Sequence, residues 1–403
     1  MKTWRPDRAA GLERLAGFTP LMGEAYAVNR NTDFGPGRNH QVSGLSPWLR
    51  RRLVSEETVV RAALEAHGPR GADKFVQEVI WRTYWKGWLE MRPEIWTRFE
   101  SELARLLAAG EAHTEAVQVA ERGGTGIEGF DDWAWELVET GWLHNHARMW
   151  FASIWIFTLG LPWVLGADFF LRHLLDGDPA SNTLSWRWVA GLQTPGKTYL
   201  ATSDNIARFT EGRYRPRGLA TVATPVTDAS PPALQPLPSA VRVPPDGSHL
   251  LLVTAEDMSP EEVIAAAGVG GVALMSEPWF DGHGAPTRRF LEGAMGDTEQ
   301  RLERRYGLGV RRLGPGSASG VGAEALIELA HAIGARAIVT PYAPVGPTAL
   351  ALAVMRPAIE GAGLDLVMVR RPWDSALWPL ADRGFFKFRE RAGPTLGSLG
   401  LPA

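Results

Sequence analysis

The stretch TGWLHNHARMWFASIWIFTLGLPWVLGADFFLRHLLDGDPASNTLSWRWVA, residues 140–190, decides the fold of this chain. Apolar and aromatic residues recur in it at helical spacing. Leu143, Ala147, Trp150 and Phe151 fall on one side of such a helix. We therefore expect helices that bury this side against neighbouring helices.

Polar side chains stand at two places within this apolar stretch. Asn145, Arg148 and Met149 lie at i, i+3 and i+4 and share one helical face. Asp176 and Asp178 follow in a turn marked by glycine and proline. A buried carboxylate is costly unless it accepts hydrogen bonds or faces a cation. The two aspartates therefore predict a polar occupant, or a pairing arginine, beside a tryptophan-rich core.

The segments TGWLHNHARM (140–149) and DGDPASNTLSWRW (176–188) resemble the FAD-binding domain of the photolyase/cryptochrome family, in its bacterial cyclobutane-dimer photolyase form. The family keeps a fixed distance between the two motifs, and this sequence fits it without a gap. The resemblance implies an all-helical domain that binds FAD. It assigns the following residues to the cofactor site: Arg148, with Asp176 or Asp178 as its partner, Gly177, and Asn182, which faces flavin N5 in the family.

The segment VSGLSPW, residues 42–48, stands where the family has the motif T-S-R-L-S-P-Y-L, after a helix whose tyrosine is Tyr26 here. The resemblance implies that hydroxyls and backbone N–H groups at this helix start hold the FAD pyrophosphate. The implied residues are Ser43, Gly44, Leu45 and Ser46. Val42 and Gly44 depart from the family threonine and arginine. A plain helix start with proline at its first position is the alternative interpretation.

The segment FVQEVIWRTYW, residues 75–85, matches the family motif E-x-x-W-R at Glu78, Trp81 and Arg82. These residues share one helical face. The resemblance implies that Arg82 helps to hold the flavin, while Glu78 and Trp81 line the cavity for the damaged bases. The alternative is an amphipathic helix that uses its tryptophans as core.

The resemblance implies light-dependent repair of cyclobutane pyrimidine dimers, in which excited reduced FAD passes one electron to the dimer. The dimer has to leave the duplex and enter a pocket, where aromatic walls stack against it. Trp81 and Trp188 supply the walls, Glu78 and Asn145 supply hydrogen bonds, and Met149 supplies soft packing. The catalytic set is therefore Glu78, Trp81, Asn145, Met149, Trp188 and Asn182.

Trp186 and Trp163 match the inner and middle members of the tryptophan chain that carries electrons to the flavin in this family. The usual place of the outer member holds no tryptophan, and Trp155 or Trp133 is a candidate for it. His146 stands where the repair enzymes carry arginine. A cryptochrome-like blue-light sensor without repair activity is therefore the alternative function, and a non-catalytic flavin-binding remnant is the third.

The composition limits the class of protein. The 403 residues are 45% hydrophobic and 22% charged, as in globular proteins. The absence of cysteine excludes disulfides and the cysteine-ligated iron–sulfur cluster of one photolyase branch. No stretch approaches the roughly 20 apolar residues of a membrane span, and no apolar signal segment begins the chain. We expect a cytoplasmic monomer with no metal site.

DNA with pyrimidine dimers is the implied partner. The formal net charge is −3, so no overall basic field indicates nucleic-acid binding. A DNA contact therefore needs a local patch. Basic residues gather near residue 210, where a solvated helix end is the alternative interpretation: Lys197, Arg208, Arg213, Arg215 and Arg217.

The chain divides by composition into a helical domain (1–216), a Pro- and Ala-rich linker (217–246) and a second domain (247–403). Fourteen of the 17 tryptophans lie in the first. Apolar runs alternate with helical ones in the last domain, which predicts a parallel, Rossmann-like α/β sheet. Its order of runs is similar to the antenna domain that precedes the flavin domain in photolyases. The resemblance implies a circularly permuted chain, whose antenna chromophore, folate or deazaflavin if any, stays open.

Overall fold

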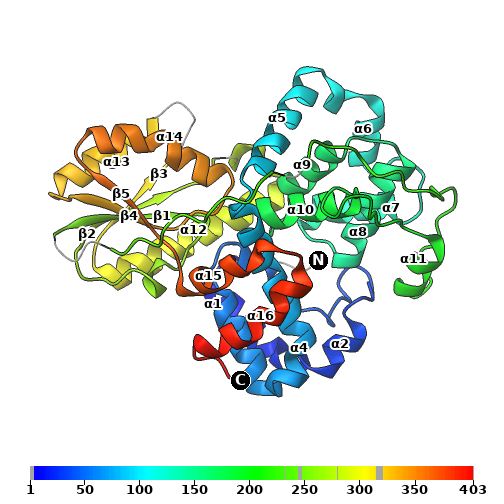
Figure 1. The fold of residues 1–403 in the computed structure, drawn as a ribbon, viewed down its shortest axis with the longest axis horizontal. Coiled ribbons are helices and arrows are strands. Elements are labelled where there is room, and N and C mark those ends of the chain that lie inside the picture. Colours follow the sequence, from blue (N-terminus) through cyan, green and yellow to red (C-terminus); the bar gives the residue numbers. More distant parts are fainter. Residues whose placement is uncertain (1–3, 231, 244–246, 279, 315–320, 403) are drawn as a thin grey trace.

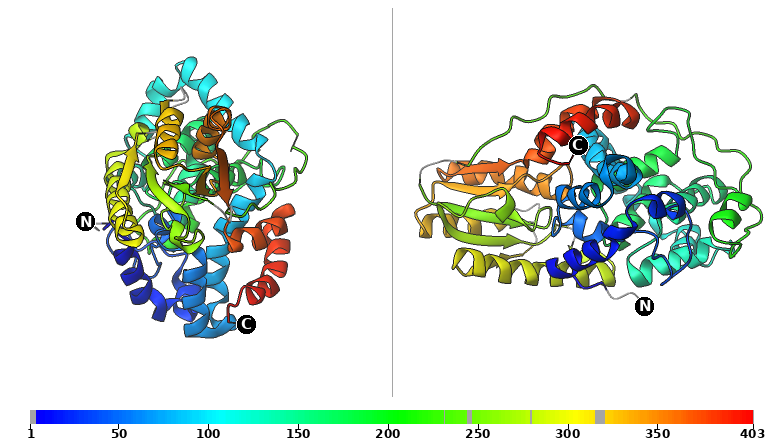
Figure 2. Two further views of the ribbon diagram at one scale, coloured as in Figure 1. Left: turned by 90° about the vertical axis from the view of Figure 1, so that its left-hand side faces the viewer. Right: turned by 90° about the horizontal axis from the view of Figure 1, so that it is seen from below.

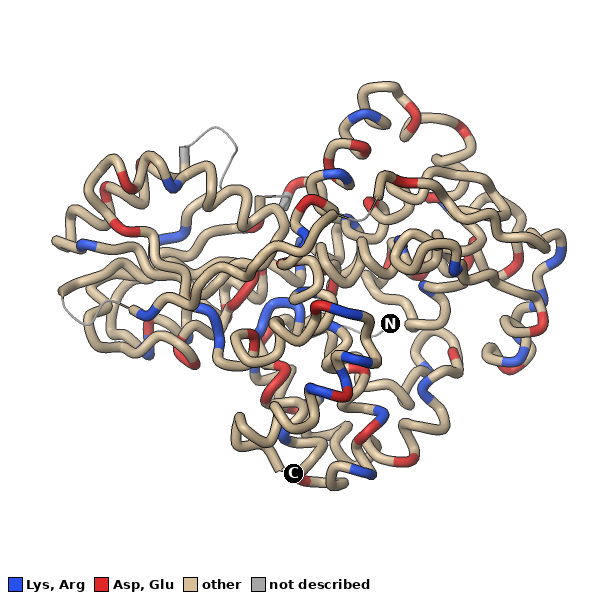
Figure 3. The backbone as a smooth tube through the Cα atoms, viewed as in Figure 1, with Lys and Arg blue, Asp and Glu red and all other residues tan. Residues whose placement is uncertain are grey.

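The computed structural model describes residues 4–230, 232–243, 247–278, 280–314 and 321–402. It is rich in helices and contains one sheet, which lies at one end of the molecule (Figure 1). Acidic and basic residues are interspersed along the whole chain (Figure 3). No helix of the described residues is long and apolar enough to cross a membrane.

Residues 4–230, as far as they are described, form helices and connecting segments without a strand. Polar side chains begin several of these helices, since a side-chain oxygen satisfies a free N–H at the first turn. Asp7 accepts from Ala10 and Ser55 accepts from Thr58 in this way. The helices are α1 (Arg8–Phe18), α2 (Glu24–Asn29), α3 (Ser46–Arg50), α4 (Glu56–Glu90), α5 (Glu94–Ala108), α6 (Glu115–Glu121), α7 (Phe130–Thr140), α8 (Asn145–Ser153), α9 (Trp163–His173), α10 (Pro179–Val189) and α11 (Ser203–Phe209).

Helix α4 is the longest of these helices and runs through the middle of the molecule (Figure 1). It is kinked at Gly68, whose φ of 64° lies in the left-handed region, and Pro69 follows directly. Proline removes one helical hydrogen bond, so the kink falls where the sequence breaks the ladder. The part of α4 after the kink carries Glu78, Trp81 and Arg82.

The sheet has five strands in the order β3-β2-β1-β4-β5, and all neighbouring strands are parallel. They are β1 (His249–Thr254), β2 (Val269–Met275), β3 (Val310–Leu313), β4 (Ala337–Pro341) and β5 (Asp365–Val369). The parallel α/β sheet predicted from the alternating apolar runs is confirmed. The strand order reverses between β1 and β4, where doubly wound sheets usually bind ligands beyond the carboxyl ends of the strands.

Three helices cover the sheet, as its two apolar faces require. They are α12 (Ala285–Tyr306), α13 (Val321–Ala332) and α14 (Pro347–Gly361). Successive side chains of a strand point to opposite faces. Leu250 and Leu252 of β1 therefore belong to the core under α13 and α14, while Leu251 and Val253 belong to the core that includes α12.

The last helices leave the sheet and pack against α4 (Figures 1 and 2). They are α15 (Pro372–Leu377), the 3-10 segment η6 (Trp378–Asp382) and α16 (Phe385–Ser398). Gly87 of α4 allows this approach, because a Cβ there would lie 2.8 Å from the Cα of Trp378. One apolar core consequently contains residues of α1, α4, the sheet and α16.

The segment between the helices and the sheet, described for residues 217–230 and 232–243, contains neither helix nor strand. It follows the outside of the molecule (Figure 2). Backbone hydrogen bonds of 3.0 Å from Val226 to Ala190 and 2.9 Å from Gln235 to Met91 tie it to the helices. Residues 231 and 244–246 of the predicted linker lie outside the described residues, and the division at 216 and 247 stays a prediction.

Candidate functional site

Asp178 begins α10 and is the centre of a buried cluster of cations. Its carboxylate accepts a hydrogen bond of 2.7 Å from the Ser181 N–H, as an N-cap does. Lys86 Nζ lies 3.5 Å, Arg82 Nη1 3.7 Å and Arg50 Nε 3.9 Å from its Oδ2 atom. Burial alone raises the pKa of a carboxyl group, but these cations more than offset it and hold the pKa of Asp178 well below its usual range.

Two of the cations around Asp178 have donor atoms that form no hydrogen bond with it. Lys86 Nζ and Arg82 Nη1 are buried, and neither atom has a hydrogen-bond partner in the part of the chain that the structure describes. A buried donor without a partner costs free energy, so this cluster is suited to an additional acceptor or anion. The sequence interpretation missed Lys86. The sequence did indicate it, because Lys86 lies four residues after Arg82 and therefore on the same face of α4.

Asp176 pairs with Arg148, and Asp178 does not. Arg148 Nη2 donates to Asp176 Oδ2 over 3.0 Å, and Arg148 Nε donates to the Leu143 carbonyl over 3.1 Å. Burial opposes ionisation of Asp176, but the adjacent Arg148 and the nearby Arg82 lower its pKa. We call residues 176–178 the DGD loop. Its two carboxylates thus face different cations, and its backbone is held by Arg50, which donates to the Gly177 carbonyl over 2.7 Å.

Tyr26 and Glu78 meet through Arg30. Arg30 Nη1 donates to Glu78 Oε1. Burial raises the pKa of Glu78 although Arg30 opposes this shift, and burial also raises the pKa of Tyr26. Two residues that the resemblance assigns to different tasks therefore lie in one polar group between α2 and α4.

The Ser43–Ser46 turn has a backbone that requires glycine at its second position. Gly44 has a φ of +59°, and a Cβ there would lie 2.5 Å from Arg14 Nη2. Arg14 Nε donates to the Ser43 carbonyl, and the Leu45 N–H donates to Ser43 Oγ over 3.3 Å. Helix α3 starts at Ser46 without a side-chain cap. A cavity of about 500 Å³, lined among others by Arg14 and Ser43, lies beside this turn.

The predicted electron-transfer residues are placed differently from one another. Trp186 is buried, and its ring contacts that of Trp155 at 6.4 Å and 89°. Gly166 makes this possible, since a Cβ there would lie 2.4 Å from Trp186 Cη2. The ring of Trp163 instead contacts that of Phe99, with 5.9 Å between the ring centres. Of the two candidates for a further member, Trp155 thus touches Trp186, whereas Trp133 stacks on Trp150 at 5.4 Å.

The two predicted stacking walls have ring partners already. Trp81 lies parallel to Phe385 of α16, with 3.4 Å between the ring centres and 7° between the planes. Trp188 stacks on Tyr199 with 5.6 Å between the ring centres. The ring contacts of the described residues do not join Trp81 to Trp188. Phe385 is a residue that the sequence interpretation missed, because nothing in the local pattern of α16 pairs it with α4.

The remaining predicted residues lie along α8 and α10. Asn145 is exposed at the first position of α8, and Met149 is half-buried. Asn182 is buried and donates from Nδ2 to the Ala167 carbonyl over 2.9 Å. His146 stacks on Trp150 at 4.6 Å and donates from Nδ1 to the Asn31 carbonyl over 2.7 Å. Burial lowers the pKa of His146, so the family arginine is replaced by a neutral side chain.

The predicted basic patch is partly neutralised. Arg213 Nη2 lies 3.1 Å from Asp33 Oδ2, and Arg215 Nη1 lies 2.9 Å from Asp204 Oδ1. Both arginines therefore have acidic partners within the chain. Lys197, Arg208 and Arg217 complete the predicted patch, and Arg208 lies over the ring of Phe209 at 5.1 Å.

Comparison with known families supports the resemblance over the helical part of the chain. Residues 75–212 match the family model described as the FAD binding domain of DNA photolyase. The deoxyribodipyrimidine photo-lyase of Streptomyces griseus is 36% identical over 153 residues, 38% of this chain and 32% of that protein. The enzyme of the same name from Thermus thermophilus is 33% identical over 220 residues, 53% of this chain and 49% of that protein.

Two solved structures resemble parts of this chain at low overall similarity. A bacterial class III photolyase from Agrobacterium tumefaciens is 26% identical, with a TM-score of 0.41, over 51% of this chain and 45% of that chain. A cryptochrome from Synechocystis has a TM-score of 0.39. The chain spans about half or less of the length of the curated relatives named above. The resemblance to the photolyase/cryptochrome family and its FAD-binding domain is thus confirmed for the matched region.

The residues present fit the cofactor that this match implies. FAD carries a pyrophosphate and hydrogen-bonding ring edges, and Arg82 and Lys86 offer buried donors without partners among the described residues. Ser181 Oγ in the turn after the DGD loop is likewise buried without a partner in that part of the chain. A charged or strongly polar group is therefore compatible with this place, which lies within residues 75–212.

Proposed function

We propose that this protein is a light-dependent DNA repair flavoprotein that splits cyclobutane pyrimidine dimers, a deoxyribodipyrimidine photo-lyase. The observation that carries the proposal is a pair of buried donor atoms without a hydrogen-bond partner among the described residues, Arg82 Nη1 and Lys86 Nζ. They lie beside the DGD loop, within the region that matches a photolyase FAD-binding domain. When bound, reduced FAD supplies the light-excited electron that opens the dimer. The protein supplies position, charge and exclusion of water.

We assign the cofactor contacts to the residues around the DGD loop and to the turn before α3. Arg148 keeps Asp176 ionised, and Lys86 with Arg82 keeps Asp178 ionised. The loop therefore holds two fixed negative charges next to two donor atoms without hydrogen-bond partners in the described part of the chain. Trp186, in ring contact with the buried Trp155, is assigned to electron transfer. We add Lys86 and Ser181 to the cofactor set that the sequence predicted. That predicted set is Tyr26, Ser43, Gly44, Leu45, Ser46, Arg82, Arg148, Asp176, Gly177, Asp178 and Asn182.

For the lesion we retain Glu78, Asn145, Met149 and Trp188 as contacts, with Trp81 as the main stacking surface. Burial raises the pKa of Glu78, while Arg30, which donates to the same carboxyl group, opposes the shift. The carboxyl group can accept from the imide edge of a pyrimidine. Base stacking on one aromatic ring contributes roughly 1–3 kcal/mol. The contact of Trp81 with Phe385 has to open before a base can take the same face.

A cryptochrome-like light sensor without repair activity is the second candidate, and the Trp81–Phe385 stack favours it. Helix α16 covers the aromatic face that a damaged base would need. The neutral His146 in place of the family arginine also removes a charge that could face a DNA phosphate.

We also propose that the sheet domain corresponds to the antenna domain of photolyases in permuted order. The support is the position of the five parallel strands after the matched helical region rather than before it. A chain relinked to place residues 247–403 first should retain flavin binding. Loss of flavin from a folded relinked chain would contradict the correspondence.

The test of the proposed function is a spectrum followed by a repair assay. We expect the purified protein to carry about one FAD and, after reduction, to restore thymine absorbance in an irradiated oligonucleotide under blue light. Trp186→Phe is the internal control. It should slow the photoreduction of oxidised FAD while repair by chemically reduced protein stays unchanged. A folded protein that refuses added FAD would contradict both candidates.

Substitution of Phe385 separates the two candidates. In a repair enzyme, Phe385→Ala frees one face of Trp81 and should strengthen binding to damaged DNA, while Trp81→Ala should weaken it. A sensor should bind irradiated and intact DNA equally in the wild type and in both variants. Phe386→Ala is the matched control, because Phe386 is exposed and belongs to the same helix.

A further inference from the structure

The carboxyl ends of the central strands hold acidic residues at the edge where such sheets usually bind ligands. Glu256 follows β1, and Glu277 follows β2. Both are buried. In this protein the edge is filled from the helical part of the chain, because Arg50, the last residue of α3, and Arg51, which follows it, extend into the edge.

Arg50 joins this edge to the DGD loop. Its Nη1 and Nη2 atoms donate to the two carboxylate oxygens of Glu256 over 2.6 and 2.8 Å, and Nη2 also lies 3.2 Å from Glu277 Oε1. From the same guanidinium, Nε donates to the Gly177 carbonyl over 2.7 Å. The side chain of Arg50 is 1% exposed, so water does not compete for these donors.

We propose that Glu256 is a positioning residue for the flavin site: it holds Arg50, and Arg50 fixes the DGD loop. The sheet domain thereby sets the affinity of the helical domain for FAD. The inference rests on FAD binding as proposed above and adds a role for a residue outside the matched region 75–212.

The geometry gives this link little freedom. A guanidinium is planar, so two parallel hydrogen bonds to Glu256 fix the direction of Nε and with it the position of the Gly177 carbonyl. The other side of the loop is closely packed, because a Cβ on Gly177 would lie 3.0 Å from the Leu171 carbonyl oxygen. Loss of the Glu256 charge should therefore release the loop and not merely the arginine.

Arg51 provides a control of the same chemistry in the same place. Its Nη1 and Nη2 atoms each donate to Glu277 over 2.9 Å, and its side chain is also 1% exposed. The hydrogen bonds and ion pairs of the described residues do not join Arg51 to the DGD loop. Arg50 and Arg51 are thus equally buried and both bind Glu277, but only Arg50 also binds Glu256 and the DGD loop. Both can be replaced by lysine, which keeps the charge and loses the two parallel hydrogen bonds.

The experiment compares Glu256→Gln, Arg50→Lys and Arg51→Lys in the full chain. FAD is titrated into each apoprotein to obtain Kd, and urea unfolding reports stability. We expect Glu256→Gln and Arg50→Lys to raise the Kd for FAD by about tenfold or more, with strongly non-additive effects in the double variant. Arg51→Lys should destabilise the fold to a similar degree while the Kd stays within about twofold of wild type.

A second readout does not need the cofactor. Amide hydrogen exchange of the peptide that contains residues 174–182 should become faster in apo Glu256→Gln, and not in apo Arg51→Lys. The inference is overturned if the wild type binds FAD while Glu256→Gln leaves both Kd and exchange unchanged, or if Arg51→Lys changes them equally. A wild type that binds no FAD contradicts the proposed function instead, and the exchange experiment then still decides whether Glu256 holds the loop.

Discussion

Two buried charge clusters lie on either side of Arg50, and they differ in how closely their cations approach the carboxylates. We call the carboxylates beyond the strand ends that bind Arg50–Arg52 the arginine socket. They are Glu256, Asp257, Glu277 and Asp374. Arg50 and Arg51 each form forked bonds of 2.6–2.9 Å there. At the DGD loop, Lys86 Nζ comes no closer than 3.5 Å to its acidic partner Asp178. Close, forked pairs are typical of a structural joint, whereas a buried ammonium group without any hydrogen bond is typical of a ligand site.

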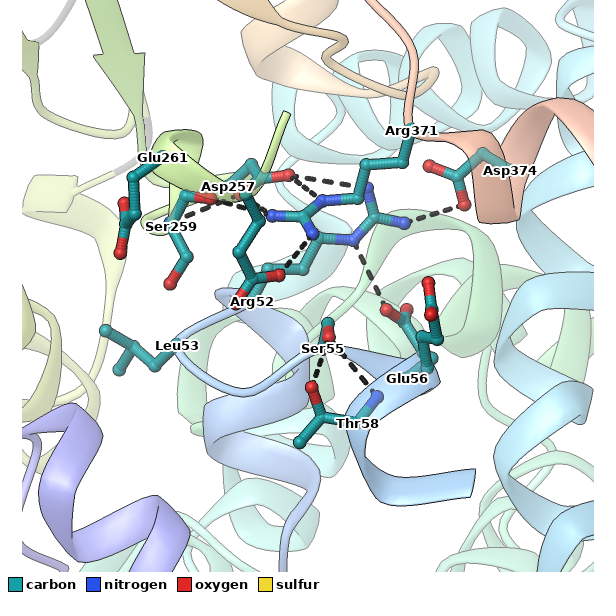
Figure 4. Close-up of polar contacts among 12 residues, drawn as sticks. Arg52, Leu53, Ser55, Glu56, Thr58, Asp257, Ser259, Glu261, Arg371 and Asp374 are labelled. Atoms are coloured by element: carbon teal, nitrogen blue, oxygen red, sulfur yellow. Dashed lines mark hydrogen bonds and ion pairs between the residues drawn. The ribbon is translucent and has the colours of Figure 1, made fainter. Parts of the chain in front are cut away.

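The largest effect should come from breaking the socket at Arg52. Its guanidinium lies 2.8 Å from Asp374, 3.3 Å from Glu56 and 3.5 Å from Asp257, facing Arg371 (Figure 4). Arg52→Met leaves these carboxylates buried without that cation. We expect a loss of roughly 3–5 kcal/mol in the free energy of unfolding. Urea unfolding measures it.

Arg312→Met is the matched control for Arg52→Met. Arg312 also has two acidic partners, Glu292 and Glu299, but its side chain is 35% exposed. Exposed pairs contribute roughly 0–1 kcal/mol. Equal losses of unfolding free energy in the two variants would mean that the buried socket contributes no more than a surface ion pair. The socket would then not be a structural joint that differs from the DGD loop.

The next effect concerns a joint that is held by an uncharged carboxyl group. Glu90, the last residue of α4, accepts from the Tyr342 hydroxyl over 2.7 Å and from the Val345 N–H over 2.5 Å, both after β4. Burial raises its pKa from 4.5 to about 7, although both hydrogen bonds oppose the shift. Its stabilising contribution is therefore complete below pH 4.5 and is lost as the pH rises through 7.

Glu90→Gln should remove this pH dependence, because an amide keeps an acceptor and never ionises. The stability of the variant relative to wild type should rise by roughly 1.4 kcal/mol per pH unit between about pH 5 and 7, then level off. Urea unfolding at a series of pH values measures the slope. Glu390→Gln, at an exposed position, is the control. Parallel pH profiles for wild type and Glu90→Gln would contradict the assignment.

Local patterns in the sequence predicted one cluster and missed the other for a physical reason. Arg148 and Asp176 are 28 residues apart, and their pairing is expected from the resemblance to the family motifs, not from the repeat of one helix. The parallel sheet follows from apolar runs. Arg50 and Glu256 are 206 residues apart, so no local pattern connects them. A run of three arginines is by itself typical of a solvated surface. Phe385 over Trp81 is a tertiary contact of the same kind.

Lys86→Met tests the ligand side of the comparison. Lys86 has no hydrogen-bond partner among the described residues, and Arg82 and Arg50 still face Asp178 when it is removed. Lys86 also faces the buried carboxylates Glu56 and Asp374. The apoprotein should therefore lose some stability, but less than Arg52→Met, because Arg52 still pairs with both carboxylates. The Kd for FAD should rise about tenfold, roughly 1.4 kcal/mol. Titration with FAD and urea unfolding of the apoprotein measure the two quantities, and a large loss of apoprotein stability would place Lys86 with the structural joints.

The smallest effect compares two serines, one in each cluster. Ser181 Oγ near the DGD loop and Ser259 Oγ near the socket are both buried without a hydrogen-bond partner among the described residues. Replacing either with alanine removes an unsatisfied hydroxyl, so neither change should lower the stability of the apoprotein. The variants should differ only when the cofactor is added. Ser181→Ala should weaken FAD binding a few-fold, because a neutral hydrogen bond contributes roughly 0.5–1.5 kcal/mol. Ser259→Ala should leave the Kd unchanged, because Ser259 lies beside the socket, where Arg371 donates to its carbonyl over 2.9 Å and to Asp257 over 2.6 Å. Equal Kd values for both variants would show that an unsatisfied buried donor does not mark the ligand side of this molecule.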